Sequence, residues 1–208
     1  YAVGKKDTFF AIPQGVEFIG DSAFAYCNNL EVFNGKFSTI DGRCLIIGRK
    51  LVAFAPDGLT TYTIADGVTE IGGGAFEGAQ SLASVGIPAT VSDIDERAFA
   101  YCLSLDNITV PTGVRELDPS TFEGCTSLAT VILPASLREI DARVFAGCSA
   151  LQSIYCRATT PPEIATGTFD AMTSTAKIYV PTSSLSAYQA APNWENYATQ
   201  IEGYEFEQ

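Results

Sequence analysis

The chain has 208 residues, with 24 Asp and Glu against 12 Lys and Arg, so its net charge is −12, and it has no histidine. The average field of such a surface repels a phosphate backbone, which makes nucleic acid and anionic membranes poor partners. Without histidine, Ser-His and Cys-His nucleophilic catalysis is excluded within this chain.

A phenylalanine recurs along the chain at nearly constant spacing. The column comprises Phe24, Phe76, Phe99, Phe122, Phe145 and Phe169, at intervals of 52, 23, 23, 23 and 24 residues. An Ile or Leu stands five residues before each Phe, and a Leu follows each of the first five by six residues. A 23-residue unit cannot bury its apolar face alone, so the repeat predicts stacked units with one continuous core.

Each unit contains a short stretch with apolar residues at alternate positions, and in most units a proline follows it, which is typical of a strand that ends there. We predict eight such strands, at residues 7–13, 30–36, 59–65, 82–88, 105–111, 128–134, 151–157 and 175–181. Asp95, Asp118 and Asp141 stand four residues before a Phe, and Pro119 follows Asp118, as at a helix N-cap and first turn. We therefore predict that each Phe lies in one short helical turn and points inward.

Two segments depart from the repeat. Residues 37–58 break the period, and turn-like residues within them predict an irregular β-hairpin in place of a normal rung. After Pro181, apolar residues follow one another at near-helical spacing from Leu185 to Tyr197, interrupted by Pro192. The predicted organisation is a solenoid over residues 1–181 and a C-terminal capping helix and tail over residues 182–208.

Three consecutive units read SVGIPATVSDIDERAFAYC, NITVPTGVRELDPSTFEGC and TVILPASLREIDARVFAGC. They resemble the BspA-like leucine-rich repeats, whose pattern is close to L-x-x-I-x-I-P-x-x-V-x-x-I-x-x-x-A-F-x-x-C, and the resemblance covers almost the whole chain. Departures are Ala79 in the Cys column, and Lys36 and Arg157 in the Pro column. The resemblance implies an α/β repeat protein: a right-handed leucine-rich-repeat solenoid, rich in β-strand with short helical turns, of about eight rungs of 23 residues.

The outward positions of the predicted strands form a second column, which reads Ala11, Asn34, Thr63, Gly86, Thr109, Ile132, Tyr155 and Tyr179. The last three are large and should form a row across adjacent rungs. Exposed aromatic side chains in a row suit a protein-binding hot spot or the stacking of a sugar. Alternatively, the three pack on one another, or under the C-terminal tail, as part of the cap. We name Ile132, Tyr155 and Tyr179 as candidate ligand-binding residues.

Four cysteines follow a Phe by three residues, and they are Cys27, Cys102, Cys125 and Cys148. Their spacing is that of the repeat, which favours buried free thiols over a metal motif. Disulfides between rungs are disfavoured, because stacked rungs hold Cβ atoms about 5 Å apart and a disulfide prefers about 3.8 Å. Cys44, in the predicted hairpin, should be the most exposed thiol.

Carboxylates also repeat, in one column of Glu70, Asp93, Glu116 and Glu139 and another of Asp95, Asp118 and Asp141. Such columns could hold Ca²⁺ or act in glycoside hydrolysis, but a catalytic pair should be unique and these pairs recur in every unit. We expect instead that the Asp residues cap the turns. We expect the Glu column to be offset by the nearby cations Arg97, Arg115, Arg138 and Arg143.

The sequence therefore predicts a non-enzymatic binding module without catalytic residues, cofactor or resident metal. We expect it to bind a protein, of the host matrix or of another cell surface, through the strand face. The alternatives are a glycan bound by the same face, or a structural spacer that presents other domains.

The resemblance also implies an extracellular or cell-surface bacterial protein associated with adhesion. No apolar run approaches the roughly 18 residues of a membrane span, so we expect no membrane insertion. The chain opens at Tyr1 without a basic and then apolar leader, so we expect a signal peptide to be absent or already removed.

Overall fold

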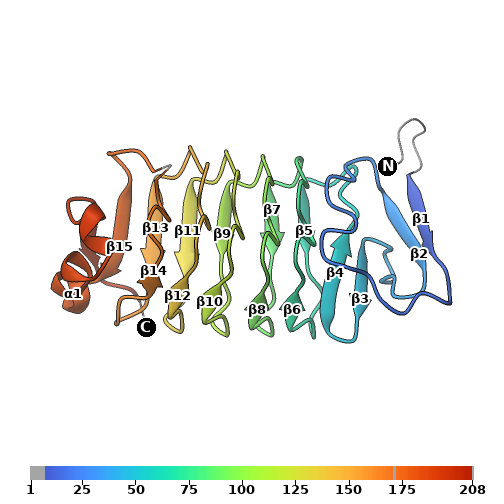
Figure 1. Ribbon diagram of the computed structural model, residues 1–208, viewed down its shortest axis with the longest axis horizontal. Helices are drawn as coiled ribbons and strands as arrows, with labels where there is room; N and C mark the ends of the chain where they lie inside the picture. The colour runs from blue at the N-terminus through green and yellow to red at the C-terminus, as the bar shows by residue number, and fades with distance from the viewer. Residues whose placement is uncertain (1–7, 171, 208) are drawn as a thin grey trace.

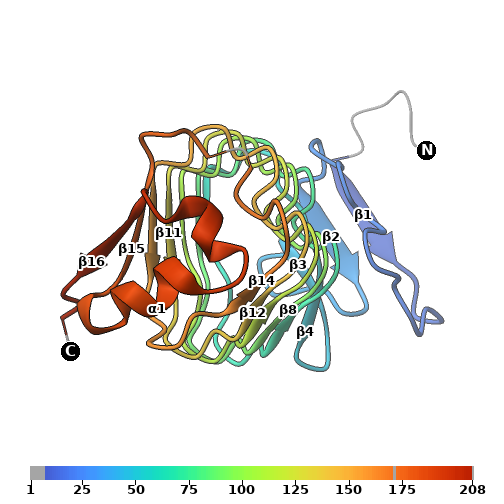
Figure 2. The same ribbon diagram turned by 60° about the vertical axis from the view of Figure 1, so that its left-hand side comes forward.

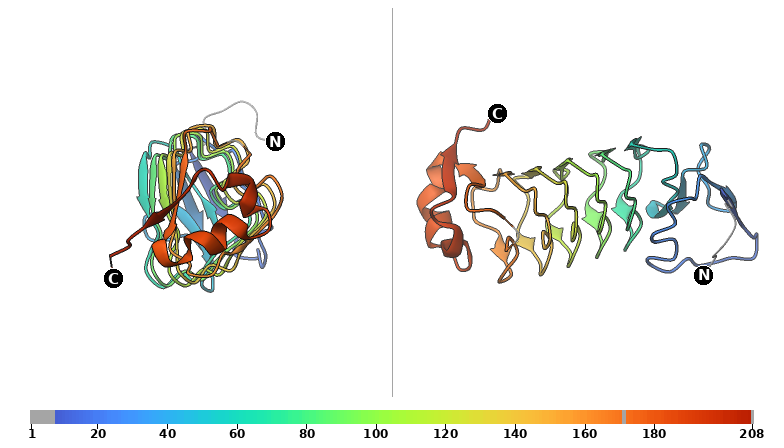
Figure 3. Two further views of the ribbon diagram at one scale, coloured as in Figure 1. Left: turned by 90° about the vertical axis from the view of Figure 1, so that its left-hand side faces the viewer. Right: turned by 90° about the horizontal axis from the view of Figure 1, so that it is seen from above.

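The computed structural model describes residues 8–170 and 172–207 and shows a β-solenoid whose rungs lie side by side along one long axis (Figure 1). Seen from above, the same turn of backbone repeats along this axis, with the only α-helix of the described residues, α1 (Leu185–Ala190), at the C-terminal end (Figure 3). The predicted solenoid begins at residue 1, and its residues 1–7 lie outside the described residues. None of the helices in the described ranges has the length and apolar character that crossing a membrane requires.

All eight predicted strands are present, each shorter than its predicted span. They are β1 (Phe9–Ile12), β2 (Val32–Gly35), β5 (Thr61–Thr63), β7 (Ser84–Gly86), β9 (Asn107–Thr109), β11 (Thr130–Leu133), β13 (Ser153–Cys156) and β15 (Lys177–Pro181). The paired strands of this series run parallel, and the predicted alternation is confirmed in β11, where Val131 and Leu133 are buried and Ile132 between them is half-buried. We call the outward side chains of β5 to β15 in this series the strand face.

A second series of two-residue strands forms another wall of the coil (Figure 2). These are β6 (Glu70–Ile71), β8 (Asp93–Ile94), β10 (Glu116–Leu117), β12 (Glu139–Ile140) and β14 (Glu163–Ile164). In each, the Ile or Leu is buried and the acidic residue lies outside. The sequence does not predict these strands, because a single apolar residue per strand leaves no alternation to detect.

The segment that carries each Phe is not a helical turn, so that prediction is wrong. Residues two before and two after the Phe have positive φ, for example Arg97 at 59° and Tyr101 at 57°. Alternate N–H groups donate to the next rung instead of within the segment: Phe99 N donates to Thr121 O at 2.9 Å, and Tyr101 N to Glu123 O at 2.7 Å. A helix would direct its N–H groups along its own axis and forfeit these bonds between rungs.

The Phe side chains do point inward, as predicted. Phe76, Phe99, Phe122, Phe145 and Phe169 are each at most 1% exposed, and neighbouring rings stack with centroids 4.9 to 5.7 Å apart. Full burial of such a side chain stabilises the fold by about 1.5–3 kcal/mol. The aromatic stack therefore joins successive rungs through the middle of the core.

The cysteine column lies beside this stack. Cys102, Cys125 and Cys148 are buried, as predicted, whereas Cys27 near the N-terminal end is half-buried. Each buried thiol donates to a Phe carbonyl of the preceding rung, as from Cys102 Sγ to Phe76 O at 3.2 Å. Each of these carbonyls already accepts a turn hydrogen bond, as Phe76 O does from Ala79 N at 3.0 Å, so the thiol adds a second donor from the next rung.

Within residues 37–58, β3 (Cys44–Ile47) and β4 (Lys50–Phe54) form an antiparallel hairpin, and β4 pairs in parallel with β6. At the Phe segments, however, the rungs of Phe24 and Phe76 are direct neighbours, since Tyr26 N donates to Glu77 O at 2.9 Å. The hairpin therefore replaces only part of a rung.

The prediction that Cys44 is the most exposed thiol is wrong. Its side chain lies on the inward face of the hairpin and is 1% exposed, with its thiol donating to the Tyr62 hydroxyl at 3.4 Å. Burial raises the pKa of this thiol to about 12.

The C-terminal segment covers the end of the coil (Figure 2). It contains η1 (Thr182–Ser184), α1 and η2 (Trp194–Tyr197), and then β16 (Ile201–Tyr204), which pairs in parallel with β15. Tyr188 and Trp194 are fully buried, and Trp194 Nε1 donates to Pro162 O at 2.7 Å. The cap thus closes the core with two aromatic side chains, and β16, which the sequence analysis did not predict, extends the sheet beyond it.

Candidate functional site

The structure brings the three predicted binding residues into one row. Ile132, Tyr155 and Tyr179 are partners across β11, β13 and β15. The two tyrosine rings stack, with centroids 4.8 Å apart and planes inclined by 18°, and all three side chains are half-buried. The predicted row is therefore confirmed, and its role in binding stays a prediction.

Two aromatic residues that the sequence analysis missed join this row. Tyr204 lies edge-on to both tyrosines, with ring centroids 5.5 Å from Tyr155 and 5.6 Å from Tyr179, and it is 42% exposed. Phe206 packs against Tyr204 with centroids 4.9 Å apart. Within residues 201–206 only Tyr204, Glu205 and Phe206 alternate, and this stretch follows the cap, where the repeat has already ended, so the sequence gives no clear strand signal.

A groove of about 720 Å³ runs beside this cluster. It is lined by Ala135, Arg157, Thr159, residues 181–183 and residues 204–207. The Arg157 guanidinium lies over the Phe206 ring, 5.6 Å from its centroid. Arg157 is the residue that replaces proline in the repeat, so the departure noted in the sequence falls at this groove.

The neighbouring cations differ in how they are paired. Lys177 forms an ion pair with Glu202 at 2.5 Å, with both side chains exposed. Arg157 forms no ion pair within the part of the chain that the structure describes. The aromatic end of the strand face therefore carries an exposed cation on an acidic molecule.

The acidic column predicted from the sequence lies on the other wall, where the parallel register aligns Glu70 with Asp93 and Glu116 with Glu139. Carboxylate oxygens of Glu116, Glu139 and Asp141 lie within 4.8 Å of one another. The strand register alone accounts for this cluster, so we assign no metal site to it.

The charges around this column differ from the prediction. Arg97 and Arg143 bind other carboxylates, and neither Arg115 nor Arg138 forms an ion pair among the described residues. The column's one ion-paired cation in the described ranges is Lys50, whose Nζ lies 2.6 Å from both Glu70 and Asp95. Lys50 thus takes the role that we predicted for the arginines.

The Asp residues beside this column are not N-caps either, because no helix follows them. Burial, and then repulsion from Glu116, Asp95 and Asp141, raises the pKa of Asp118 to about 6. Away from Lys50, the carboxylates of this wall therefore form no ion pair among the described residues.

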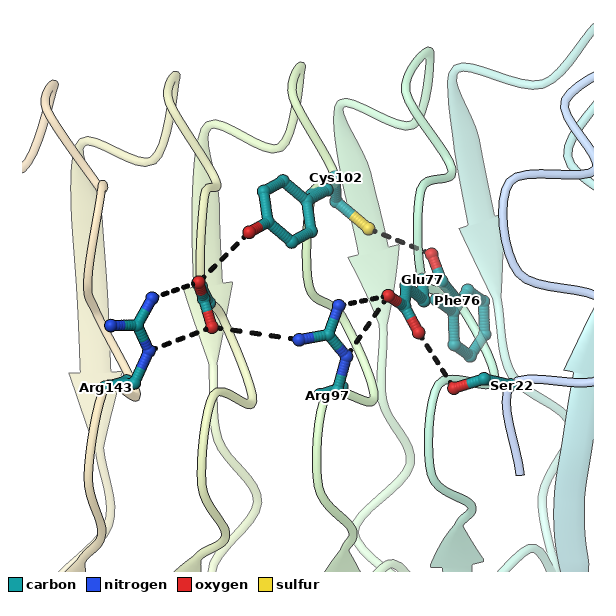
Figure 4. Close-up of polar contacts among 8 residues, drawn as sticks. Ser22, Phe76, Glu77, Arg97, Cys102 and Arg143 are labelled. Atoms are coloured by element: carbon teal, nitrogen blue, oxygen red, sulfur yellow. Dashed lines mark hydrogen bonds and ion pairs between the residues drawn. The ribbon is translucent and has the colours of Figure 1, made fainter.

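The Phe segments carry an ion network that the sequence analysis missed (Figure 4). Arg97 lies between two carboxylates on adjacent rungs: it donates to Glu77 and forms a longer ion pair with Glu123 at 3.9 Å. Arg143 donates to Glu123 at 2.5 Å and lowers the pKa of that carboxyl to about 2. Both Glu residues are buried, so the network joins rungs and presents little free charge.

The fold and the repeated inward columns define the class: this is a leucine-rich-repeat solenoid of about eight turns. The model of the BspA type leucine-rich repeat region matches residues 5–45 and 47–175 in six copies. The chain belongs to this family, as the motifs predicted.

Solved structures show the same fold. A leucine-rich repeat protein from Eubacterium ventriosum matches with a TM-score of 0.66 and 19% identity, covering 83% of this chain and 48% of that chain. A leucine rich cell surface protein from Faecalibacterium prausnitzii matches with a TM-score of 0.50 and 24% identity, covering 82% of this chain and 51% of that chain. The pneumococcal vaccine antigen PcpA matches with a TM-score of 0.55 and 13% identity, covering 94% of this chain and 54% of that chain.

The chain spans about half the length of these solved chains. At these identities the likeness shows the fold alone. A comparison with curated proteins finds no match.

Proposed function

We propose that this chain is a non-catalytic binding module that takes a protein ligand on the aromatic end of its strand face. The observation that carries the proposal is the half-exposed row of Tyr155, Tyr179 and Tyr204 on a sheet, with Arg157 beside it. Tyrosine and arginine are the residues most enriched in protein-binding hot spots. Apart from Ile132, which adjoins Tyr155, the rest of the outward column is small or polar, so binding energy should concentrate at this end.

The packing of the tyrosines favours a protein over a glycan. A sugar stacks on a free ring face, but Tyr155 and Tyr179 cover one face of each other. On its other side, Tyr155 has Ile132 as its register neighbour. With these faces covered, a ligand would meet mainly ring edges and hydroxyl groups, which suit side-chain packing and hydrogen bonds in a protein interface.

We place the module in a surface or secreted bacterial protein, with adhesion as its role. The support comes from the family and from two similar structures, one described as a cell surface protein and one as a vaccine antigen.

The test is binding of the purified chain to an array of host matrix proteins, bacterial surface proteins and glycans. The double variant Tyr155→Ala/Tyr179→Ala is measured alongside, with Thr109→Ala as a control at a polar position of the same column. Two hot-spot truncations should weaken binding by at least about 30-fold, and Thr109→Ala should leave it unchanged.

Three other outcomes count against the proposal. Binding that the tyrosine variant retains would move the site elsewhere on the molecule. Competition by a free oligosaccharide would replace the protein ligand with a glycan. Absence of binding across the array would favour a spacer that presents other domains.

A further inference from the structure

The last residues of the chain lie on the candidate site itself. Tyr204 ends β16 opposite Pro181 of β15, and Phe206 then lies against Arg157, which follows the end of β13. Residues 204–207, which we call the tail, therefore reach back from the added strand past the aromatic row. Together with Arg157 and residues 181–183, they line the 720 Å³ groove.

The tail forms only part of the interactions that this groove offers. Its Phe206 ring interacts with Arg157, which for an exposed cation–π pair contributes about 0.5–1 kcal/mol. Its carboxylates, Glu205 and Glu207, line the groove, but neither forms an ion pair with Arg157. A carboxylate placed on the guanidinium would add a charge-assisted hydrogen bond, which is roughly twice as strong as a neutral one.

The tail is also weakly held. Beyond Tyr204, which pairs with β15, no backbone hydrogen bond joins described tail residues to the rest of the chain. Phe206 is half-buried and contacts Tyr204 and Arg157. An occupant that bonds Arg157 better can displace such a segment without disturbing the core.

We propose that the groove beside Arg157 takes an extended peptide with an aromatic residue next to an acidic one, and that the tail occupies the site in competition with it. This inference rests on the proposed function and names the ligand class of the same site. The aromatic side chain would replace Phe206, and the neighbouring carboxylate would pair with Arg157. The tail's own sequence, Tyr-Glu-Phe-Glu, supplies a probe of this chemistry.

The experiment measures the fluorescence anisotropy of a labelled Gly-Tyr-Glu-Phe-Glu peptide with the full chain and with full-length variants. In the parent chain the tail fills most of the grooves. Phe206→Ala removes this competition, so the variant should bind the peptide at least about fivefold more tightly than the parent chain does. Adding Arg157→Gln to Phe206→Ala should lower the affinity for the peptide at least about tenfold. The matched control is Arg138→Gln, an exposed arginine on the other wall, which should change nothing.

A second probe, Gly-Tyr-Gln-Phe-Gln, removes the charges and should bind at least about fivefold more weakly to Phe206→Ala. Equal affinity of the parent chain and Phe206→Ala would overturn the competition by the tail. Equal affinity of the two peptides, or an Arg157→Gln variant that binds normally, would overturn the ligand class. None of these three results affects the array experiment, so a ligand found there whose binding needs Tyr155 and Tyr179 would leave the proposed function standing.

Discussion

Arg97 is shared by two carboxylates that the fold has taken out of water. The side chain of Glu77 is 4% exposed and that of Glu123 is 9% exposed, while Arg97 itself is 33% exposed. Glu123 keeps Arg143 and the Tyr101 hydroxyl as partners, but the partner that Glu77 keeps is the hydroxyl of Ser22. The stability of the network therefore depends more on Arg97 than on the exposed Arg143.

We expect Arg97→Ala to lower the free energy of unfolding by about 2–3 kcal/mol, because it leaves Glu77 buried without a cation. Arg115→Ala, at an exposed arginine without an ion pair, should change it by less than about 0.5 kcal/mol. Urea unfolding followed by circular dichroism measures both. Equal effects of the two substitutions would mean that the network contributes nothing.

Burial should also determine which cysteines react in the folded chain. Burial raises the pKa of Cys44, Cys102 and Cys148 to about 12, so almost no thiolate forms near neutral pH. We expect Cys27, the half-buried thiol, to react with a thiol reagent in the folded chain, and the other cysteines to react only after unfolding. Mass spectrometry of alkylated peptides checks this, and rapid labelling of Cys44 in the folded chain would contradict the inward face of the hairpin.

At the scale of the strands, the acidic column makes stability depend on pH. The pKa of Asp118 is raised to about 6 by burial and then by Glu116, and that of Glu139 is also raised by burial and then by Glu116. Between about pH 4 and pH 6 the folded chain therefore binds more protons than the unfolded chain, so stability rises as the pH falls through this window. Below about pH 4 the sign reverses, because Glu123, whose pKa is lowered to about 2, loses its ion pair with Arg143 when it is protonated.

The thermal midpoint should therefore increase from about pH 7 to about pH 5 and decrease again below about pH 4. Asp118→Asn removes the carboxyl whose pKa is raised. The variant should therefore be more stable than the parent at pH 7, and its thermal midpoint should increase much less between pH 7 and pH 5. Asp66→Asn, at an exposed aspartate away from the column, is the control. A midpoint that decreases steadily from pH 7 to pH 5 would show that the column is screened by solvent.

The strands also show what a sequence can predict. Alternation predicted that Ile132, Tyr155 and Tyr179 lie in one row, because parallel strands in register place residues at equivalent repeat positions on the same face of the sheet. The Phe segments were mistaken for helical turns because Asp and Pro favour both a helix start and a tight turn. Only the hydrogen bonds between rungs decide between the two, and no single unit contains them.

The site was predictable only where it follows the repeat. Tyr204 and Phe206 reach the aromatic row from beyond the cap, where no spacing relates them to Tyr155. Arg97 meets Glu77 across 20 residues of chain, and Arg143 meets Glu123 across the same distance two rungs later, but the rung between them has Ala100 and Ser120 at these positions. Such contacts depend on how the whole coil is closed, so they emerge only from the three-dimensional structure.

At the scale of the whole molecule, each rung contacts only its neighbours, so the ends control how the array unfolds. At the C-terminal end, the Trp194 ring lies 5.6 Å from Phe169, the last ring of the core stack, and 5.0 Å from Tyr188. Trp194→Ala should remove about 3–5 kcal/mol from this interface. Since nearest-neighbour contacts carry the stability, we expect the last rungs to open before the centre does.

Hydrogen exchange read by mass spectrometry separates the two regions. In Trp194→Ala, amides of β14 and β15 should lose protection while β7 and β9 keep theirs, whereas Phe122→Ala, in the middle of the stack, should lower protection on both sides of its rung. Equal loss everywhere in Trp194→Ala would mean that the solenoid unfolds as one unit. Because Tyr179 lies on β15, ligand binding should weaken with the loss of the cap, although Trp194 lies in the core and not on the strand face.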